Sequence, residues 1–149
     1  MSRRSLLRRS WLWAPPLAYM ALIFYLSSKS DPLPQLTAHV WDKALHAIEY
    51  GTLALLLCRA FIGEGCGRLA AIGLALACTS TYGASDEWHQ LFVPPRTSDV
   101  HDWLADSLGG AAALGVFAAI DLAFHGGAHD RPTANRAPIE SRDIQSLDR

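Results

Sequence analysis

The sequence predicts an all-α integral membrane protein, built as a bundle of four transmembrane helices. Half of the 149 residues are hydrophobic and only 18% are charged, and the apolar residues gather in four blocks. Lys and Arg residues concentrate at both ends of the chain and beside the loop between the second and third blocks. At the opposite ends of the blocks, acidic residues recur at helical spacing, which predicts a polar site at one membrane face.

The four apolar blocks have the length of helices that cross a bilayer. They cover residues 11–27, 45–62, 68–85 and 103–124. A helix needs about 20 mainly apolar residues to cross the hydrocarbon core. Ala, Gly and Ser are frequent in the third and fourth blocks. Small residues let helices approach closely in lipid, so these two blocks are expected to pack tightly.

The distribution of basic residues predicts the orientation of the helices. Cytoplasmic loops are enriched in Lys and Arg, and here the enriched sides are the two termini and the loop between Arg59 and Arg68. The sequence therefore predicts a multi-pass protein of the plasma membrane with both termini in the cytoplasm. It divides into a basic N-terminus (1–10), a transmembrane domain (11–125) and a disordered cytoplasmic tail (126–149). Residues 28–44 and 86–102 form the outer loops, the second as a polar hairpin.

Other protein classes fit the chain less well. A net charge of −1 argues against a nucleic-acid partner, which would require a basic excess. Cys58, Cys66 and Cys78 lack metal-ligand spacing and are odd in number, so structural thiols are expected. The stretch "SRRSLL" resembles a twin-arginine export signal. No small-residue cleavage motif follows the first block, however, which favours the membrane interpretation.

One face of the second helix carries a polar stripe. Asp42, His46, Glu49 and Tyr50 fall at offsets of zero, four, seven and eight, and Lys43 lies beside them. Asp42 occupies a position expected of a helix N-cap. Glu49 lies about two turns inside the helix, where an ionisable group costs several kcal/mol unless it faces protein, water or a ligand. Glu49 is therefore a functional candidate.

A second polar stretch, "SDEWHQLFVPPRTSDVHDWLADSLGG", joins the third and fourth helices. Prolines break the helix after Gln90, and Arg96 follows them, where it can pair with several carboxylates. Ser98 or Asp99 is expected to cap the fourth helix. Asp86 and Gln90 share one face of the third helix, Asp102 and Asp106 lie on one stripe of the fourth helix, and Arg96 lies in the turn between them. Asp86 and Glu87 are adjacent, so one of them is expected to face solvent or a second partner.

These stretches resemble the two motifs of the VanZ-like membrane proteins. "DKALHAIEYGTLALLL" is similar to the first, and "SDEWHQLFVPPRTSDVHDWLADSLGGAAALG" to the second. Asp106 stands where the family pattern more often has Asn, and Pro95 replaces a frequent Gly. The resemblance covers about residues 11–124. It implies a cell-envelope protein of bacterial type, similar to proteins associated with low-level teicoplanin resistance.

Several functions remain open at this point. The chain is interpreted first as a binding or accessory protein that engages a membrane lipid, a lipid-linked envelope precursor or a lipoglycopeptide. The alternative is an enzyme acting on a lipid-linked phosphate or glycan, with His46, Asp86, Glu87 and Asp102 as catalytic candidates. An ion-pair network that only holds the helices together is a third possibility, and a proton-coupled transporter a weaker fourth. In the enzyme alternative, Asp86, Glu87 or Asp102 would hold a cation or act as the base. No cofactor is identified, and no metal-ligand set is assigned. The expected ligand-binding residues are Asp42, Lys43, His46, Glu49, Tyr50, Asp86, Glu87, Gln90, Arg96, Asp102 and Asp106.

Overall fold

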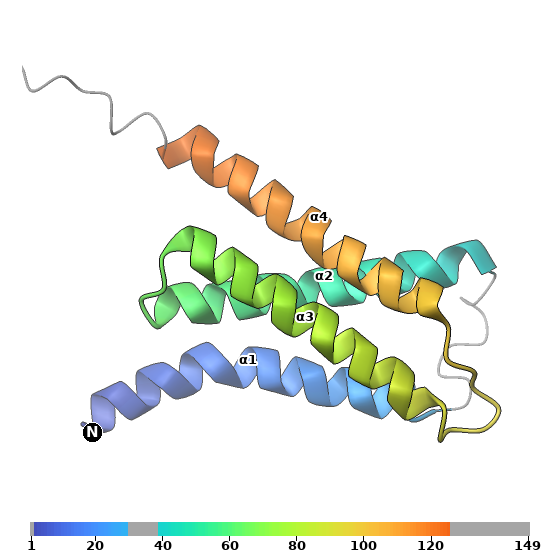
Figure 1. Ribbon diagram of the computed structural model, residues 1–149. Coiled ribbons are helices and arrows are strands. Elements are labelled where there is room, and N and C mark those ends of the chain that lie inside the picture. Colours follow the sequence, from blue (N-terminus) through green and yellow to red (C-terminus); the bar gives the residue numbers. More distant parts are fainter. Residues whose placement is uncertain (1, 30–38, 126–149) are drawn as a thin grey trace, which may run out of the picture.

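The computed structural model describes residues 2–29 and 39–125, and these form four helices and no strand. The helices are α1 (Arg3–Ser27), α2 (His39–Gly63), α3 (Arg68–Gln90) and α4 (Val100–His125), in the arrangement of Figure 1. The all-α prediction is confirmed. The predicted tail and most of the first outer loop lie outside the described residues.

Two of these helices, α2 and α4, are long and apolar enough to cross a membrane. The other two have similar lengths, 25 residues for α1 and 23 for α3. They are more polar, because α1 begins with an arginine-rich turn and α3 ends in the sequence "SDEWHQ". Four crossings with a defined orientation therefore stay a prediction.

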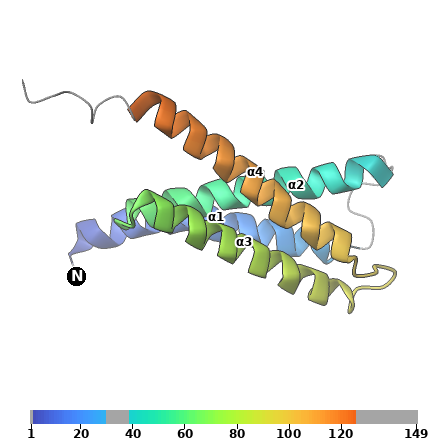
Figure 2. The ribbon, with the colours of Figure 1, turned by 45° about the horizontal axis from the view of Figure 1, so that its top comes forward.

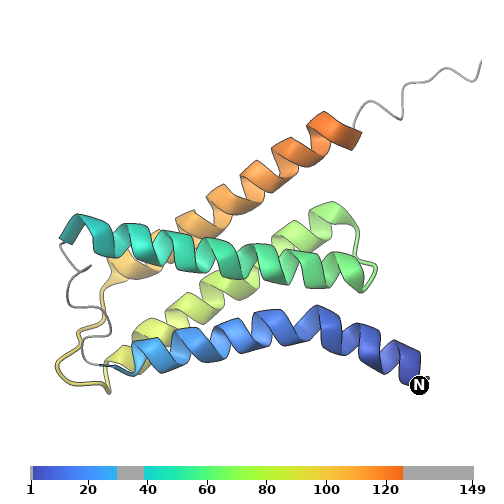
Figure 3. The ribbon, with the colours of Figure 1, turned by 180° about the vertical axis from the view of Figure 1, so that it is seen from behind.

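The helix ends differ from the expected ones in two informative places. α1 begins at Arg3, so most of the predicted basic N-terminus is helical, and it runs through Pro15 and Pro16. Figure 3 shows α1 bent near its middle, as expected where prolines remove backbone donors. α2 begins at His39, which places Asp42 in its first turn. The N-cap role predicted for Asp42 is therefore wrong.

α2 lies at the centre of the bundle. It packs against the other three helices, α3 contacts both α1 and α4, and α1 does not contact α4 (Figures 1 and 2). Tyr50, Leu53 and Leu114 are almost fully buried where α2 meets its neighbours. Beyond this crossing, the C-terminal half of α4 diverges from the other helices (Figure 3).

Small residues allow the helices to approach closely. A Cβ atom on Gly51 of α2 would lie 3.1 Å from the Gly109 carbonyl oxygen of α4. On Gly109, a Cβ would lie 2.5 Å from the Cα of Ala47. The two helix backbones are thus nearly in contact, and the stripe of acidic residues on α4 is brought against the polar face of α2.

The outer surface of the bundle is strongly apolar. Large hydrophobic side chains are exposed on all four helices, among them Leu17, Phe24, Ile48, Leu69, Leu74, Leu108, Val116, Ile120 and Phe124. Contiguous apolar surface of this kind is rare on soluble monomers, whereas lipid covers it in membrane proteins. The exposed surface therefore supports a membrane location.

The end of the bundle that holds the N-terminus is fastened by polar contacts. Trp13 donates its indole N–H to the Glu64 carboxylate, and Arg9 forms an ion pair with Glu64 at 3.3 Å. Arg68 and Asp121 pair across α3 and α4. The remaining acidic residues of the described helices lie at the opposite end, where the candidate site is found.

Candidate functional site

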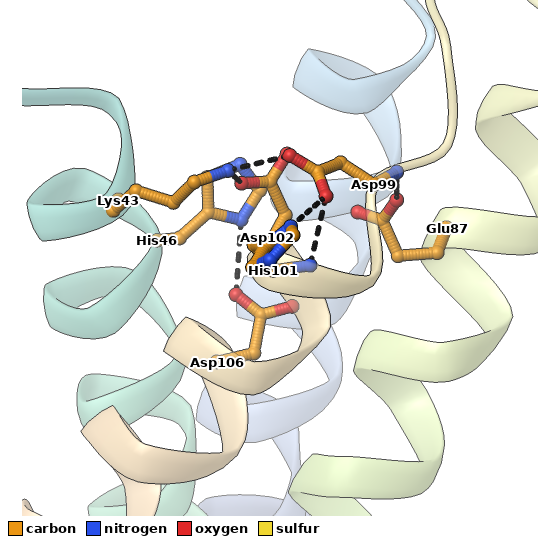
Figure 4. A network of polar contacts seen from close by, with 7 residues as sticks. All are labelled: Lys43, His46, Glu87, Asp99, His101, Asp102 and Asp106. Atoms are coloured by element: carbon orange, nitrogen blue, oxygen red, sulfur yellow. Dashed lines mark hydrogen bonds and ion pairs between the residues drawn. The ribbon is translucent and has the colours of Figure 1, made fainter. Parts of the chain in front are cut away.

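The polar residues singled out in the sequence lie at one end of the bundle. They come from the first turns of α2 and α4, the last turn of α3 and the hairpin between α3 and α4. Helices α2 and α4 both begin at this end, and α3 ends there, which explains why residues far apart in the sequence meet. Part of this assembly, a network of hydrogen bonds and ion pairs, is drawn in Figure 4.

Lys43 links α2 to the start of α4. Its ammonium group donates to Asp99 Oδ2 at 2.9 Å and also pairs with Asp102. Asp99 precedes α4 and accepts from the backbone N–H of His101 at 2.9 Å, so it caps the helix as predicted. The nearby Lys43 ammonium, together with the His101 contacts, holds the pKa of the Asp99 carboxyl well below its usual range.

His46 and Asp106 form a second link between the same helices. His46 Nδ1 lies 2.9 Å from Asp106 Oδ1, and Asp106 is completely buried (Figure 4). The carboxyl group of Asp106 also packs against α3, since a Cβ on Gly83 would lie 2.9 Å from Asp106 Oδ2. A larger residue at position 83 would push Asp106 away from its histidine.

Asp86 and Glu87, at the end of α3, are both buried and face different partners. Asp86 Oδ2 accepts from the Gln90 side-chain amide at 3.1 Å, one turn further on. Glu87 Oε2 accepts from the backbone N–H of Asp99 at 2.7 Å and so ties α3 to the hairpin. Neither carboxylate points to solvent. The sequence predicted that either Asp86 or Glu87 would face solvent or a second partner. Glu87 faces a second partner, the backbone of Asp99.

Arg96 does not pair with the carboxylates as expected. Its Nε donates to the Lys29 carbonyl oxygen at 3.1 Å, and no carboxylate of the described residues forms an ion pair with it. The prediction of a multiply paired arginine is therefore wrong for the described part of the chain. Arg96 instead lines a cavity, so its guanidinium is available to pair with an anionic group bound there.

This cavity has a volume of about 300 Å³ and lies between α1, α2, α3 and the hairpin. Its polar lining consists of six of the predicted residues and Ser27: Asp42, His46, Glu49, Asp86, Gln90 and Arg96. Its apolar lining comes from Tyr19, Leu22, Ile23, Leu26, Leu45 and Ile48. The other predicted residues, Lys43, Tyr50, Glu87, Asp102 and Asp106, lie outside its lining.

Several buried polar atoms at this end have no hydrogen-bond partner among the described residues. They include Tyr50 Oη, Asp86 Oδ1, Glu87 Oε1 and Asp106 Oδ2. Leaving a buried polar group unpaired costs about 1–3 kcal/mol, and more for a charged one. Buried oxygens without partners call for an explanation, and a bound ligand, ion or water is one. Their concentration here therefore supports this end of the bundle as the candidate site.

The sequence did not single out the α1 wall of the cavity or the contacts of His89. Tyr19, Leu22 and Leu26 recur every three or four residues, a spacing that could have indicated an inward face of α1. His89 of α3 stacks on Phe24 of α1 with ring centroids 4.5 Å apart. No local pattern indicates this contact, because it depends on how α1 packs against α3.

One cluster has the donor types of a metal site. Asp42, His46 and Asp102 each offer a ligand atom, and these atoms lie within 4.8 Å of one another. Two carboxylates and an imidazole can together bind a divalent ion. Asp42 and His46 are one turn apart on α2, whereas Asp102 comes from α4, so the sequence alone could not assemble the set.

Comparison with known proteins identifies one match. A family model described as VanZ/LLP1 matches residues 6–121, which is more than half of the chain. The matched region includes all four helices from the first turns of α1 almost to the end of α4, and with them every residue of the candidate site. No curated protein and no solved structure matches the chain.

Proposed function

The chain belongs to the VanZ/LLP1 family, and from this premise we propose that it binds a membrane lipid or lipid-linked molecule through an anionic head group. The protein would act in the plasma membrane as a multi-pass protein with cytoplasmic termini, and its ligand would enter from the outer leaflet. The observation that carries the proposal is the cavity of about 300 Å³, which is lined by both apolar and charged side chains.

The two kinds of lining residue match the two parts of a lipid. Leu22, Leu26 and Ile48 offer apolar surface to an acyl or isoprenyl chain. Leu22 and Ile48 are also 47% and 68% exposed, so apolar lining residues are continuous with the surface that would face lipid. A chain could therefore pass from the bilayer into the cavity without crossing a polar barrier.

Arg96 supplies the charge that selects the head group. It lines the cavity, and its guanidinium forms no ion pair with a described carboxylate. Arg binds phosphate and carboxylate through paired N–H donors. Gln90 and Ser27 add neutral hydrogen-bonding groups beside it. A phosphate- or pyrophosphate-linked lipid fits this lining, as does the acidic end of a lipoglycopeptide.

The test is to purify the full chain in mild detergent and identify co-purifying lipids by mass spectrometry. We expect a defined anionic lipid with the wild type, its loss in Arg96→Ala and a changed lipid profile in Asp86→Asn. Arg68→Ala is the matched control, because it removes an arginine at the other end of the bundle. An unchanged profile in folded Arg96→Ala would contradict the proposal.

A second candidate function is an enzyme acting on a lipid-linked phosphate or glycan. The observation that favours it is the pair of His46 and buried Asp106, since His46 also lines the cavity. A carboxylate that orients a histidine is a common arrangement for proton transfer. The wild type and the His46→Gln variant are each incubated with a lipid-linked pyrophosphate. Release of product by the wild type and not by the variant would indicate an enzyme, whereas unchanged lipid would indicate binding alone.

The family resemblance also suggests a cellular phenotype. Proteins similar to this chain are associated with low-level teicoplanin resistance, and binding of an envelope lipid or of the lipoglycopeptide itself would account for such an effect. Expression of the wild type and of Arg96→Ala in a susceptible bacterium, followed by measurement of the inhibitory concentration of teicoplanin, tests this link. We expect a small increase with the wild type alone.

A further inference from the structure

We propose that the first turns of α2 and α4 hold a divalent transition-metal ion, with Asp42, His46 and Asp102 as its ligands. The three ligand atoms lie within 4.8 Å of one another. Two ligands at about 2.0–2.2 Å from one ion are separated by at most about 4.4 Å. Small rotations of the carboxylates therefore suffice to close the site. The inference goes beyond lipid binding, since the ion requires no lipid.

The environment of His46 is that of a metal ligand. Its Nδ1 lies 2.9 Å from Asp106 Oδ1 (Figure 4). Asp106 is fully buried and packs against Gly83 of α3. When Nδ1–H donates to this carboxylate, Nε2 carries the lone pair that a metal needs. Histidines that bind metals almost always donate their other N–H to a carboxylate, a carbonyl or water. Asp106 is thus a positioning residue for the site.

A second observation points to a cation, independent of the cluster itself. Asp86 lines the same cavity as Asp42 and His46, is 5% exposed, and has an Oδ1 without a hydrogen-bond partner among the described residues. Asp106 Oδ2 is unpaired as well. Such a buried carboxyl group stays ionised only where positive charge lies nearby, and a bound cation would supply that charge.

Among the described residues, acidic groups outnumber basic ones at this end of the bundle. Seven described carboxyl groups lie here: Asp42, Glu49, Asp86, Glu87, Asp99, Asp102 and Asp106. Lys43 is engaged by Asp99 and Asp102, Lys29 lies over the Tyr25 ring, and Arg96 forms no ion pair with a described carboxylate. A divalent ion beside His46 would offset part of this excess negative charge.

The donor set favours particular ions. Mg²⁺ and Ca²⁺ take oxygen ligands, whereas an imidazole with carboxylates suits Zn²⁺, Mn²⁺ or Fe²⁺. Lys43 bonds Asp102 through Oδ1, which leaves Oδ2 of that carboxylate for the ion. Removal of the Lys43 charge should therefore strengthen metal binding, because it removes a cation next to a ligand.

The test is metal binding to the purified full chain. The protein is treated with a chelator, equilibrated with Zn²⁺ or Mn²⁺, and analysed by elemental mass spectrometry and calorimetry. We expect about one ion per chain, its loss in Asp42→Asn and His46→Gln, tighter binding in Lys43→Gln and binding about tenfold weaker in Asp106→Asn. His101→Gln is the matched control, since His101 is exposed at the same end.

Thermal unfolding of the wild type with and without the ion keeps the test independent of whether the variants fold. We expect the ion to raise the melting temperature of the wild type and of His101→Gln. Absence of stoichiometric binding by the wild type overturns the site, as does equal binding by folded Asp42→Asn or His46→Gln. The Arg96→Ala variant is expected to lose the lipid and to keep the metal ion. Metal binding and lipid binding are therefore tested separately, and the failure of one does not imply the failure of the other.

Discussion

Replacement of Gly109 by alanine is expected to separate α2 from α4 and so to dismantle the site. An added Cβ would lie 2.5 Å from Ala47 Cα and 2.6 Å from its carbonyl carbon. Ordinary contacts between carbon atoms are about 3.5–4.0 Å, so the helices must move apart by about 1 Å. The obstacle is backbone, which cannot rotate away as a side chain can.

The size of this effect follows from a matched variant on the same helix. Overpacking costs about 1–3 kcal/mol, and a backbone obstacle places Gly109→Ala near the upper end. Alanine in place of glycine inside a helix contributes about 1 kcal/mol in the opposite direction. A Cβ on Gly115 of α4 meets nothing within 4 Å, so Gly115→Ala has the same gain in propensity and no clash. The difference between the two variants is then the clash itself, about 3 kcal/mol.

Both variants can be compared by thermal unfolding in detergent and by their bound lipid and metal. We expect Gly109→Ala to unfold at a lower temperature than the wild type and to lose both ligands, because Asp102 and Asp106 follow α4 away from His46. Gly115→Ala should be at least as stable as the wild type. Equal stability of the two variants would refute the close approach of α2 and α4 at this point.

Three further predictions address other parts of the bundle. Leu45→Trp should fill the cavity and abolish lipid binding while the protein stays folded, as measured by lipid mass spectrometry and circular dichroism. Tyr82→Phe removes a 2.7 Å hydrogen bond to the Met20 carbonyl oxygen and should lower the free energy of unfolding by about 1 kcal/mol. Asp99→Asn keeps a capping side chain but removes the ion pair with Lys43. Because the folded-state pKa of Asp99 is lowered, its contribution is present above the ordinary aspartate pKa and is lost as the pH falls further. The difference in melting temperature between wild type and Asp99→Asn should therefore narrow on acidification.

The helices could be predicted from the sequence because their signals are local. Apolar blocks of sufficient length and the prolines after Gln90 indicate helices and a break between them, and the structure agrees. Offsets of three and four also place Asp102 and Asp106 on one face of α4, and both are buried. These inferences need only the geometry of a single helix.

The partners of each side chain could not be predicted, since they depend on how the helices cross. Several carboxylates lie near Arg96 along the sequence, yet its Nε bonds a backbone carbonyl instead. Likewise Asp is a common N-cap residue, which made Asp42 a candidate cap, but α2 begins three residues before it. The α1 wall of the cavity was missed for a different reason: its apolar spacing is also what a lipid-facing helix shows.

The position of Asp106 connects the fold to the proposed chemistry. This carboxyl group is completely buried among three helices, and its stability there depends on His46. A protonated His46 would neutralise Asp106 directly. A neutral His46 bound to a metal ion would instead donate its Nδ1–H to Asp106, and the ion would supply the positive charge nearby. Either arrangement requires α2 and α4 to stay in contact at Gly51 and Gly109, one turn below the site. The same glycine crossing that packs the bundle therefore sets the distance between His46 and Asp106, so packing and ligand binding at this end cannot be changed independently.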